Sequence, residues 1–154
     1  MHGADGGPRR LLLVDDEADI LESLQQLLEA SIEDLHVVCA ADGQEALDRL
    51  HEAPFDALVT DYKMPGMDGL ELLRHARQDA PSVVRILMTA YPDLQIAIEA
   101  INEASIQTFF TKPLDPPEVV RVVTDVLRRR QADRHRERAF ARAMDQARKA
   151  RGAP

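Results

Sequence analysis

Five short apolar runs, separated by amphipathic stretches, follow one another along this 154-residue chain. The runs occupy residues 10–14, 35–40, 57–60, 83–88 and 106–110. Between them, apolar side chains recur at every third or fourth residue, which is typical of helices that bury one side. Strands that are apolar throughout, in alternation with helices, predict a parallel sheet that is covered on both faces. The chain is therefore expected to fold as an α/β protein.

The number of expected elements narrows the fold further. Helices are predicted over residues 20–28, 43–50, 70–77 and 92–104, and a fifth helix is predicted to begin at residue 115. Five strands and five helices fit a flavodoxin-like, doubly wound five-stranded parallel sheet of order 2-1-3-4-5 with right-handed crossovers. Neither proline nor glycine occurs between Pro117 and Gly152, so the last helix is expected to be extended well past the sheet.

The formal charge of −8 is distributed unevenly along the chain. Residues 1–127 have 24 acidic and 9 basic side chains, whereas residues 128–154 have 3 acidic and 10 basic side chains, so the two segments carry −15 and +7. The sequence therefore predicts a flexible N-terminal segment over 1–8, a folded domain over 9–128 and a basic helical C-terminal extension over 129–154. An acidic domain with no helix-turn-helix after it argues against nucleic acid as a partner.

The composition also excludes several classes of protein. The single cysteine, Cys39, rules out a disulfide framework and a cysteine zinc site. No apolar run approaches the roughly 18–20 residues that span a bilayer, and residues 1–7 lack the apolar region of a secretory signal. We therefore expect a cytoplasmic protein with no membrane partner.

Polar residues that are capable of chemistry follow four of the five predicted strands. Asp15 and Asp16 follow the first strand, Asp61 the third, Thr89 the fourth and Lys112 the fifth. In a doubly wound sheet, ligands bind beyond the carboxyl ends of the strands, where the strand order reverses. For the order 2-1-3-4-5, that point lies between the first and third strands. The five side chains are therefore expected to converge at one edge of the sheet.

Three carboxylates at one edge of a sheet require compensation. Two like charges about 4 Å apart repel by roughly 4 kcal/mol at an effective dielectric of about 20. A divalent cation relieves this repulsion, and oxygen ligands with no nearby Cys or His favour Mg²⁺. Lys112 and Thr89 offer a positive charge and a hydroxyl to a phosphoryl group, and Asp61 is placed to act as a nucleophile. This set predicts Mg²⁺-dependent phosphoryl transfer onto Asp61.

Four segments surround these residues: LLLVDDE at 11–17, LVTDYKMPGMDGLELL at 58–73, ILMTAY at 86–91 and FFTKPLDPPE at 109–118. In combination and in chain order, they resemble the receiver domains of two-component response regulators, and the resemblance covers residues 9–128. It implies that Asp61 is a phosphoacceptor that takes its phosphoryl group from a histidine kinase or a histidine phosphotransfer protein. It also implies a phosphorelay signalling protein that slowly dephosphorylates itself, and not an enzyme.

The resemblance also assigns roles to the surrounding residues. Asp16 is expected to bind Mg²⁺ directly together with Asp61, Asp15 to bind it more remotely or through water, and the backbone carbonyl of Lys63 to supply a further ligand. Thr89 is expected to be the switch hydroxyl, drawn toward the phosphoryl group. Phe109, three residues before the phosphate-contacting lysine, matches the switch aromatic of the family.

Two positions depart from the commonest pattern of the family. Lys63 lies two residues after the expected phosphoacceptor, and Tyr91 lies two residues after the switch hydroxyl. In the family, both positions flank the path of the hydrolytic water. We therefore predict that the cationic Lys63 and the bulky Tyr91 tune the lifetime of the phosphoryl group by slowing its hydrolysis.

The output and the oligomeric state are left open by the sequence. A switch of this kind remodels the face that is formed by the helix over 92–104, the strand over 106–110 and the helix that begins at residue 115. The sequence fits a homodimer through that face or through the extended last helix. It also fits an output domain that is separate or absent from this chain. The basic extension also fits a solvated helix with no partner, or one that folds against an acidic domain.

Three other kinds of protein share part of this pattern. A Mg²⁺-dependent phosphatase of the haloacid-dehalogenase type also uses a strand-end Asp, Thr and Lys, but it needs a second Asp at the position of Lys63. A nucleotide- or flavin-binding protein of the same fold needs a glycine-rich loop after the first strand, where Asp-Asp-Glu stands. A receiver-like protein that acts by protein contact, without phosphorylation, is the third.

Overall fold

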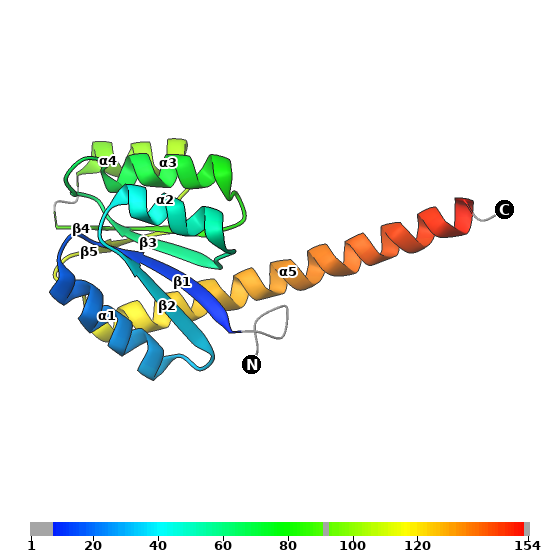
Figure 1. Cartoon of the computed structure of the whole chain (residues 1–154), viewed down its shortest axis with the longest axis horizontal. Helices are drawn as coiled ribbons and strands as arrows, with labels where there is room; N and C mark the ends of the chain where they lie inside the picture. Colours follow the sequence, from blue (N-terminus) through cyan, green and yellow to red (C-terminus); the bar gives the residue numbers. More distant parts are fainter. Residues whose placement is uncertain (1–7, 91–92, 153–154) are drawn as a thin grey trace.

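The computed structural model describes residues 8–90 and 93–152 of the chain (Figure 1). The five strands are β1 (Arg9–Val14), β2 (Leu35–Ala40), β3 (Ala57–Asp61), β4 (Val84–Thr89) and β5 (Thr108–Thr111). The five helices are α1 (Ala18–Ser31), α2 (Gly43–Glu52), α3 (Gly69–Asp79), α4 (Leu94–Ala104) and α5 (Pro116–Gly152). Strands and helices alternate along the chain, as predicted.

The five strands form one sheet in the order β2-β1-β3-β4-β5. All neighbouring strands are parallel, and the register places Leu12 opposite both Val38 of β2 and Leu58 of β3. This arrangement confirms the predicted flavodoxin-like fold of order 2-1-3-4-5. The strand order reverses between β1 and β3, so the carboxyl ends of these two central strands frame the point where ligands bind in such folds.

The two faces of the sheet bury two separate apolar clusters. On β1, Leu11 and Leu13 belong to one cluster and Leu12 and Val14 to the other, because successive side chains of a strand point to opposite faces. Helices α1 and α5 cover the first face, and α2, α3 and α4 cover the second (Figure 1). Because both faces are covered, the strands are apolar throughout, which is the pattern from which the sheet was predicted.

Aspartates that precede three of the helices mark where the helices begin. The side chain of Asp42 accepts a hydrogen bond from the backbone N–H of Glu45 at 2.8 Å, and Asp68 accepts one from Glu71 at the same distance. Asp93 accepts one at the start of α4. Such caps satisfy backbone donors that the first turn of a helix leaves without a partner.

The strand β5 begins at Thr108, two residues later than the apolar run predicted. Ser105 ends α4 in the left-handed conformation with φ of 49°, and the backbone N–H of Ile106 bonds back to Ala100. Ile106 is therefore part of the turn after α4, although it packs against the core as a strand residue would. Periodicity alone does not separate a partly buried turn residue from the first residue of a strand.

Helix α5 is unbroken over 37 residues and passes through residue 128 without interruption. Its first half packs on the sheet through Val119, Val123, Val126 and Leu127. Its second half extends away from the body into solvent (Figure 1). The last helix is therefore extended, as predicted.

Two of the sequence predictions concern residues outside the described part of the chain. The segment over 1–8 was predicted to be flexible, and of it the structure describes Pro8 alone. Tyr91, one of the two residues that were predicted to tune dephosphorylation, also lies outside the described residues. Within the described ranges, the structure contains no helix with the length and apolar character that crossing a membrane requires.

Candidate functional site

The strand ends bring the predicted site residues together at one edge of the sheet. Asp15 directly follows β1, Asp61 is the last residue of β3, Thr89 is the last residue of β4, and Lys112 directly follows β5. Asp16 lies in the loop between β1 and α1. Asp15, Asp61 and Thr89 are buried, and Asp16 is exposed. The site is therefore a mostly buried set of polar groups with one carboxylate open to solvent.

Lys112 links two of the carboxylates. Its Nζ lies 2.9 Å from Oδ2 of Asp15 and 3.2 Å from Oδ1 of Asp61. Asp15 is itself fixed, because its Oδ1 accepts a hydrogen bond of 2.9 Å from the backbone N–H of Glu17. The backbone N–H of Lys112 donates to the carbonyl of Thr89 at 2.8 Å, which ties the lysine to the end of β4. The Lys112–Pro113 peptide bond after it is cis.

These charges shift the pKa values of two groups in the site. Burial, and then the negative charge of Asp15, raise the pKa of Asp61 above its ordinary value, although Lys112 acts in the opposite direction. Burial alone would lower the pKa of Lys112, but the hydrogen bond and charge of Asp15, together with Asp61, outweigh it and raise the pKa. The site thus stabilises the positive charge of Lys112. It makes the negative charge of Asp61 less favourable than it would be in water.

The three carboxylates can hold a metal ion. One oxygen atom from each of Asp15, Asp16 and Asp61 can be chosen so that all three lie within 4.8 Å of one another. An all-oxygen donor set of this size suits a hard divalent cation such as Mg²⁺. Lys63, whose backbone carbonyl is the predicted fourth ligand, lies two residues beyond Asp61 with an exposed side chain. The residues present therefore fit the Mg²⁺ that the sequence predicts.

Gly69 is a further residue of the site, which the sequence did not single out. Its backbone N–H donates to the carbonyl of Tyr62 at 2.7 Å, and its Cα lies close to the end of β3. A Cβ at this position would overlap the carbonyl oxygen of Asp61 and lie 2.9 Å from its carbonyl carbon. The loop between β3 and α3 thus returns to pack directly against the backbone of Asp61. The signal in the sequence is Asp-Gly at the start of α3, which by itself indicates only a cap.

The predicted switch residues lie on neighbouring strands. The side chain of Thr89 is buried at the carboxyl end of β4. Phe109, on β5, is half-buried and packs against the cluster under α2, α3 and α4. β4 and β5 pair so that Leu87 stands opposite Phe109, two residues before Thr89. The Phe109 side chain thus packs partly against the core and is partly exposed to solvent.

Comparisons with known proteins agree with this geometry. The response regulator receiver domain profile matches residues 11–124. The chain is 31% identical over 82% of its length to the hydrogenase transcriptional regulatory protein HoxA of Cupriavidus necator, and 33% identical over 84% to the transcriptional regulatory protein TrcR of Mycobacterium tuberculosis. It spans 26% of the first and 49% of the second.

A solved structure of a receiver domain has the same fold. The signal receiver domain of an HD domain-containing protein from Pseudomonas fluorescens superposes with a TM-score of 0.77 at 34% identity. The superposition covers 81% of this chain and 98% of that domain. The matched profile runs from Leu11, within β1, to Thr124, in the first quarter of α5, and includes every residue of the carboxylate and lysine cluster. The chain belongs to the response regulator receiver domain family.

Proposed function

We propose that this protein is a phospho-accepting switch in which Asp61 takes a phosphoryl group from a histidine kinase or a histidine phosphotransfer protein. The observation that carries the proposal is the arrangement around Asp61. Its carboxylate lies 3.2 Å from Nζ of Lys112, belongs to the three-carboxylate cluster, and stands beside the buried Thr89. A nucleophile, a fixed positive charge and a hydroxyl donor at one sheet edge are what in-line phosphoryl transfer requires.

In the proposed reaction, a carboxylate oxygen of Asp61 attacks the phosphorus of a phosphohistidine. The new bond is the O–P bond of an aspartyl phosphate, and the bond that breaks is the P–N bond to the histidine, which leaves with the electron pair and is protonated. When bound, Mg²⁺ would neutralise charge on the phosphoryl oxygens. Asp15 and Asp16 would hold the ion with Asp61 and the carbonyl of Lys63. Lys112 would turn from Asp61 to the phosphoryl group.

The raised pKa of Asp61 fits this role. Burial and the nearby Asp15 make the ionised form of the Asp61 carboxylate unfavourable. Attack on phosphorus would move that negative charge onto the phosphoryl oxygens, where the positively charged groups of the site would stabilise it. Lys112 keeps its charge through Asp15, which is fixed by the Glu17 backbone and is not consumed in the reaction. The lysine would therefore keep its charge and its contact with Asp15 while it turns from Asp61 to the phosphoryl group. The chain accepts and loses a phosphoryl group, and is not an enzyme that turns over a substrate.

The proposed switch follows from the same site. The hydroxyl of Thr89 would move toward the phosphoryl oxygens, and the space it leaves would let Phe109 turn further into the core. That movement would remodel the face formed by α4, β5 and α5. Phosphorylation acts here only through its different interaction energy with the two conformations. Its effect would reach residues 129–152 because α5 is continuous.

The partners and the compartment belong to the proposal too. A phosphohistidine donor and a protein that responds to the switched face are the expected partners, and the cytoplasm is the expected location. The curated relatives are transcriptional regulators that are two to four times as long as their match to this chain. An output domain, in this protein or in a separate one, is therefore part of the proposed function.

The test is modification of Asp61 by a small phosphodonor. The full chain with Mg²⁺ and acetyl phosphate should gain the mass of one phosphoryl group, and the gain should be lost in the presence of a chelator. Asp61→Asn should show no gain, whereas Asp68→Asn, which removes the next carboxylate along the loop, should show the full gain. If the wild-type chain gains no mass at any Mg²⁺ concentration, it acts by protein contact alone and the proposal is wrong.

The same experiment separates the switch from a phosphatase. A haloacid-dehalogenase phosphatase would release many equivalents of inorganic phosphate from acetyl phosphate, because a second aspartate assists each cycle. Lys63 occupies the position of that aspartate and cannot take its role as a general acid and base in the same way. We expect slow phosphate release that is limited by the lifetime of the aspartyl phosphate.

A further inference from the structure

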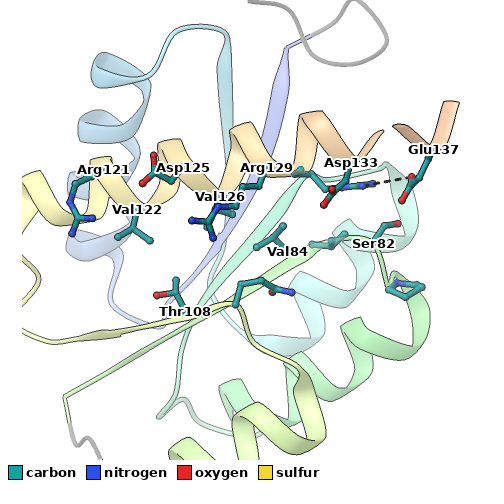
Figure 2. Close-up of a pocket in the computed structure, with 14 residues that line it drawn as sticks. Ser82, Val84, Thr108, Arg121, Val122, Asp125, Val126, Arg129, Asp133 and Glu137 are labelled. Carbon is teal, nitrogen blue, oxygen red and sulfur yellow. Dashed lines mark ion pairs between the residues drawn. The ribbon is translucent and has the colours of Figure 1, made fainter. Parts of the chain in front are cut away.

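A groove runs along the side of α5, at the end of the sheet opposite the phosphorylation site. It has a volume of about 500 Å³ and lies between α5 and the residues that begin β4 and β5. Val84, Val122 and Val126 form its apolar part (Figure 2). Val84 and Val122 are only half-buried, so the groove retains apolar surface that the described part of the chain does not cover.

The α5 side of this groove carries charges of both signs, among them Arg130 and Glu137, which pair with each other. Arg121, Asp125, Arg129 and Asp133 follow one another at intervals of four residues along the helix, as Figure 2 shows. A second copy of the helix, laid beside the first in the opposite direction about residue 131, would bring Arg129 of each copy opposite Asp133 of the other. This pair of residues therefore fits an antiparallel copy of the same helix.

The projecting half of α5 carries an exposed aromatic side chain. Phe140 is 67% exposed and Met144 is 55% exposed, which makes them the most accessible large apolar side chains of the extension. Phe140 lies on the same face of the helix as the groove, because Val122, Arg129, Asp133 and Phe140 are separated by seven, four and seven residues. A groove with apolar surface and an exposed phenyl ring thus occupy one helix face.

The charge distribution decides how two copies can meet. Residues 128–154 carry +7 and residues 1–127 carry −15. Parallel pairing of two extensions would place +7 beside +7, whereas antiparallel pairing places the basic extension of each copy along the acidic body of the other. Complementary charge favours the second arrangement and specifies a second copy of this chain as the partner.

We propose that two copies of this protein pair through α5 in antiparallel orientation, with Phe140 of each copy seated in the groove beside Val122 of the other. The pairing is a closed two-fold contact, in which the same surface of both copies is used. The register that places Phe140 opposite Val122 also places Arg129 opposite Asp133. The apolar contact and this charge contact therefore agree on one register.

The first experiment measures assembly. Sedimentation equilibrium of the full chain, without phosphodonor, should give a monomer–dimer equilibrium. Phe140→Ala should raise the dimer dissociation constant by at least about tenfold, since aromatic anchors dominate such contacts. Ala139→Ser, on another face of the same helix turn, should change it by less than about threefold. A wild-type chain that stays monomeric at 0.1 mM, which is about a hundredfold above a 1 μM dissociation constant, overturns the proposal.

The second experiment tests the charge register. Arg129→Asp and Asp133→Arg should each weaken the dimer, and the double variant should restore it, because the two residues face each other across the two-fold axis. Arg142→Asp makes the same charge reversal on the far side of the helix and should have little effect. Circular dichroism of each variant controls for helix content. A double variant that is weaker than both single variants contradicts the register.

The third experiment measures orientation. With Cys39 replaced by Ser and a spin label on Lys149→Cys, antiparallel pairing about residue 131 should place the two labels about 50 Å apart, since each residue of a helix rises about 1.5 Å. Parallel pairing would place them within about 20 Å. The short distance would overturn the proposal, as would a dimer that strengthens with added salt. None of these results depends on whether Asp61 is phosphorylated.

Discussion

The guanidinium of Arg134, in the extended part of α5, lies 2.9 Å from Oδ1 of Asp56, directly before β3. The other oxygen of Asp56 accepts a hydrogen bond of 2.9 Å from the backbone N–H of Arg10 at the start of β1. Arg130, one turn earlier on α5, is buried beside this contact. The helix is thus bound to the two central strands at the end of the sheet opposite Asp61.

The first prediction concerns this ion pair. Arg134→Ala should lower the free energy of unfolding by about 1–3 kcal/mol, because it leaves the largely buried carboxylate of Asp56 with one partner fewer. The extension should also become more accessible to trypsin. Arg136→Ala, which removes an exposed pair with Asp133, should change the free energy by less than about 0.5 kcal/mol. Urea unfolding measures both, and equal effects would show that Arg134 contributes no more than a surface charge.

The second prediction concerns the glycine that packs on the phosphoacceptor. Gly69→Ala should cost about 1–3 kcal/mol, because the new Cβ overlaps the carbonyl oxygen of Asp61. The displaced Asp61 should also accept a phosphoryl group more slowly from acetyl phosphate. Gly66→Asn should affect neither quantity strongly, since the space around Gly66 is open and asparagine tolerates its φ of 76°. Normal phosphorylation of Gly69→Ala would contradict the proposed role of this contact.

The third prediction concerns stability and pH. The pKa of Asp61 is raised above its ordinary value of 3.8, so its stabilising contribution is complete below that pH and is lost as the pH rises through the folded-state pKa. Asp61→Asn, in a chelator, should therefore be more stable than the wild type at pH 7, and its advantage should shrink as the pH falls. Urea midpoints at several pH values measure this. Glu22→Gln, at an exposed carboxyl of α1, is the control, and a less stable Asp61→Asn at pH 7 would contradict the prediction.

The fourth prediction concerns the metal. Mg²⁺ should raise the melting temperature, since a ligand that binds only the folded state adds about 2.7 kcal/mol at one hundred times its dissociation constant. Asp16→Asn should remove most of this effect without loss of stability in the chelator, because Asp16 is exposed and belongs to the three-carboxylate cluster. Asp19→Asn, an exposed carboxylate of α1 outside the cluster, should keep the full effect. An unchanged Mg²⁺ response in Asp16→Asn would exclude it as a ligand.

The fifth prediction concerns the lifetime of the phosphoryl group. If Lys63 and Tyr91 slow the approach of the hydrolytic water, Lys63→Ala and Tyr91→Ala should each shorten the half-life of the aspartyl phosphate. Release of the label from the phosphorylated chain, after the donor is removed, measures the half-life. A half-life that neither substitution shortens means that both side chains leave the water path open.

The fold and the centre of the candidate site could be predicted because they depend on short-range patterns. Continuous apolar strands between amphipathic helices imply a parallel sheet, and a parallel sheet brings its carboxyl strand ends to one edge, so Asp15, Asp61, Thr89 and Lys112 had to converge. The start of β5 was predicted too early because Ile106, in the turn after α4, is partly buried against the core. Burial alone does not distinguish a turn from a strand.

The contacts that depend on tertiary distance were not predictable. Nothing near Asp56 in the sequence indicates Arg134 as its partner, because the pairing depends on how far α5 continues along the sheet. The approach of Gly69 to Asp61 depends on the path of the loop between them. In the same way, the groove beside Val122 appears only when α5 and the starts of β4 and β5 are placed together.

The unbroken course of α5 makes the extension a lever. Residues 135–152 extend about 27 Å beyond Arg134, since each helical residue adds about 1.5 Å, and no glycine or proline before Gly152 provides a hinge. A tilt of a few degrees where Val119 and Val123 meet the sheet is therefore magnified at the tip. The ion pair between Arg134 and Asp56 is the point beyond which the helix projects from the body, so this contact sets the length of the projecting segment.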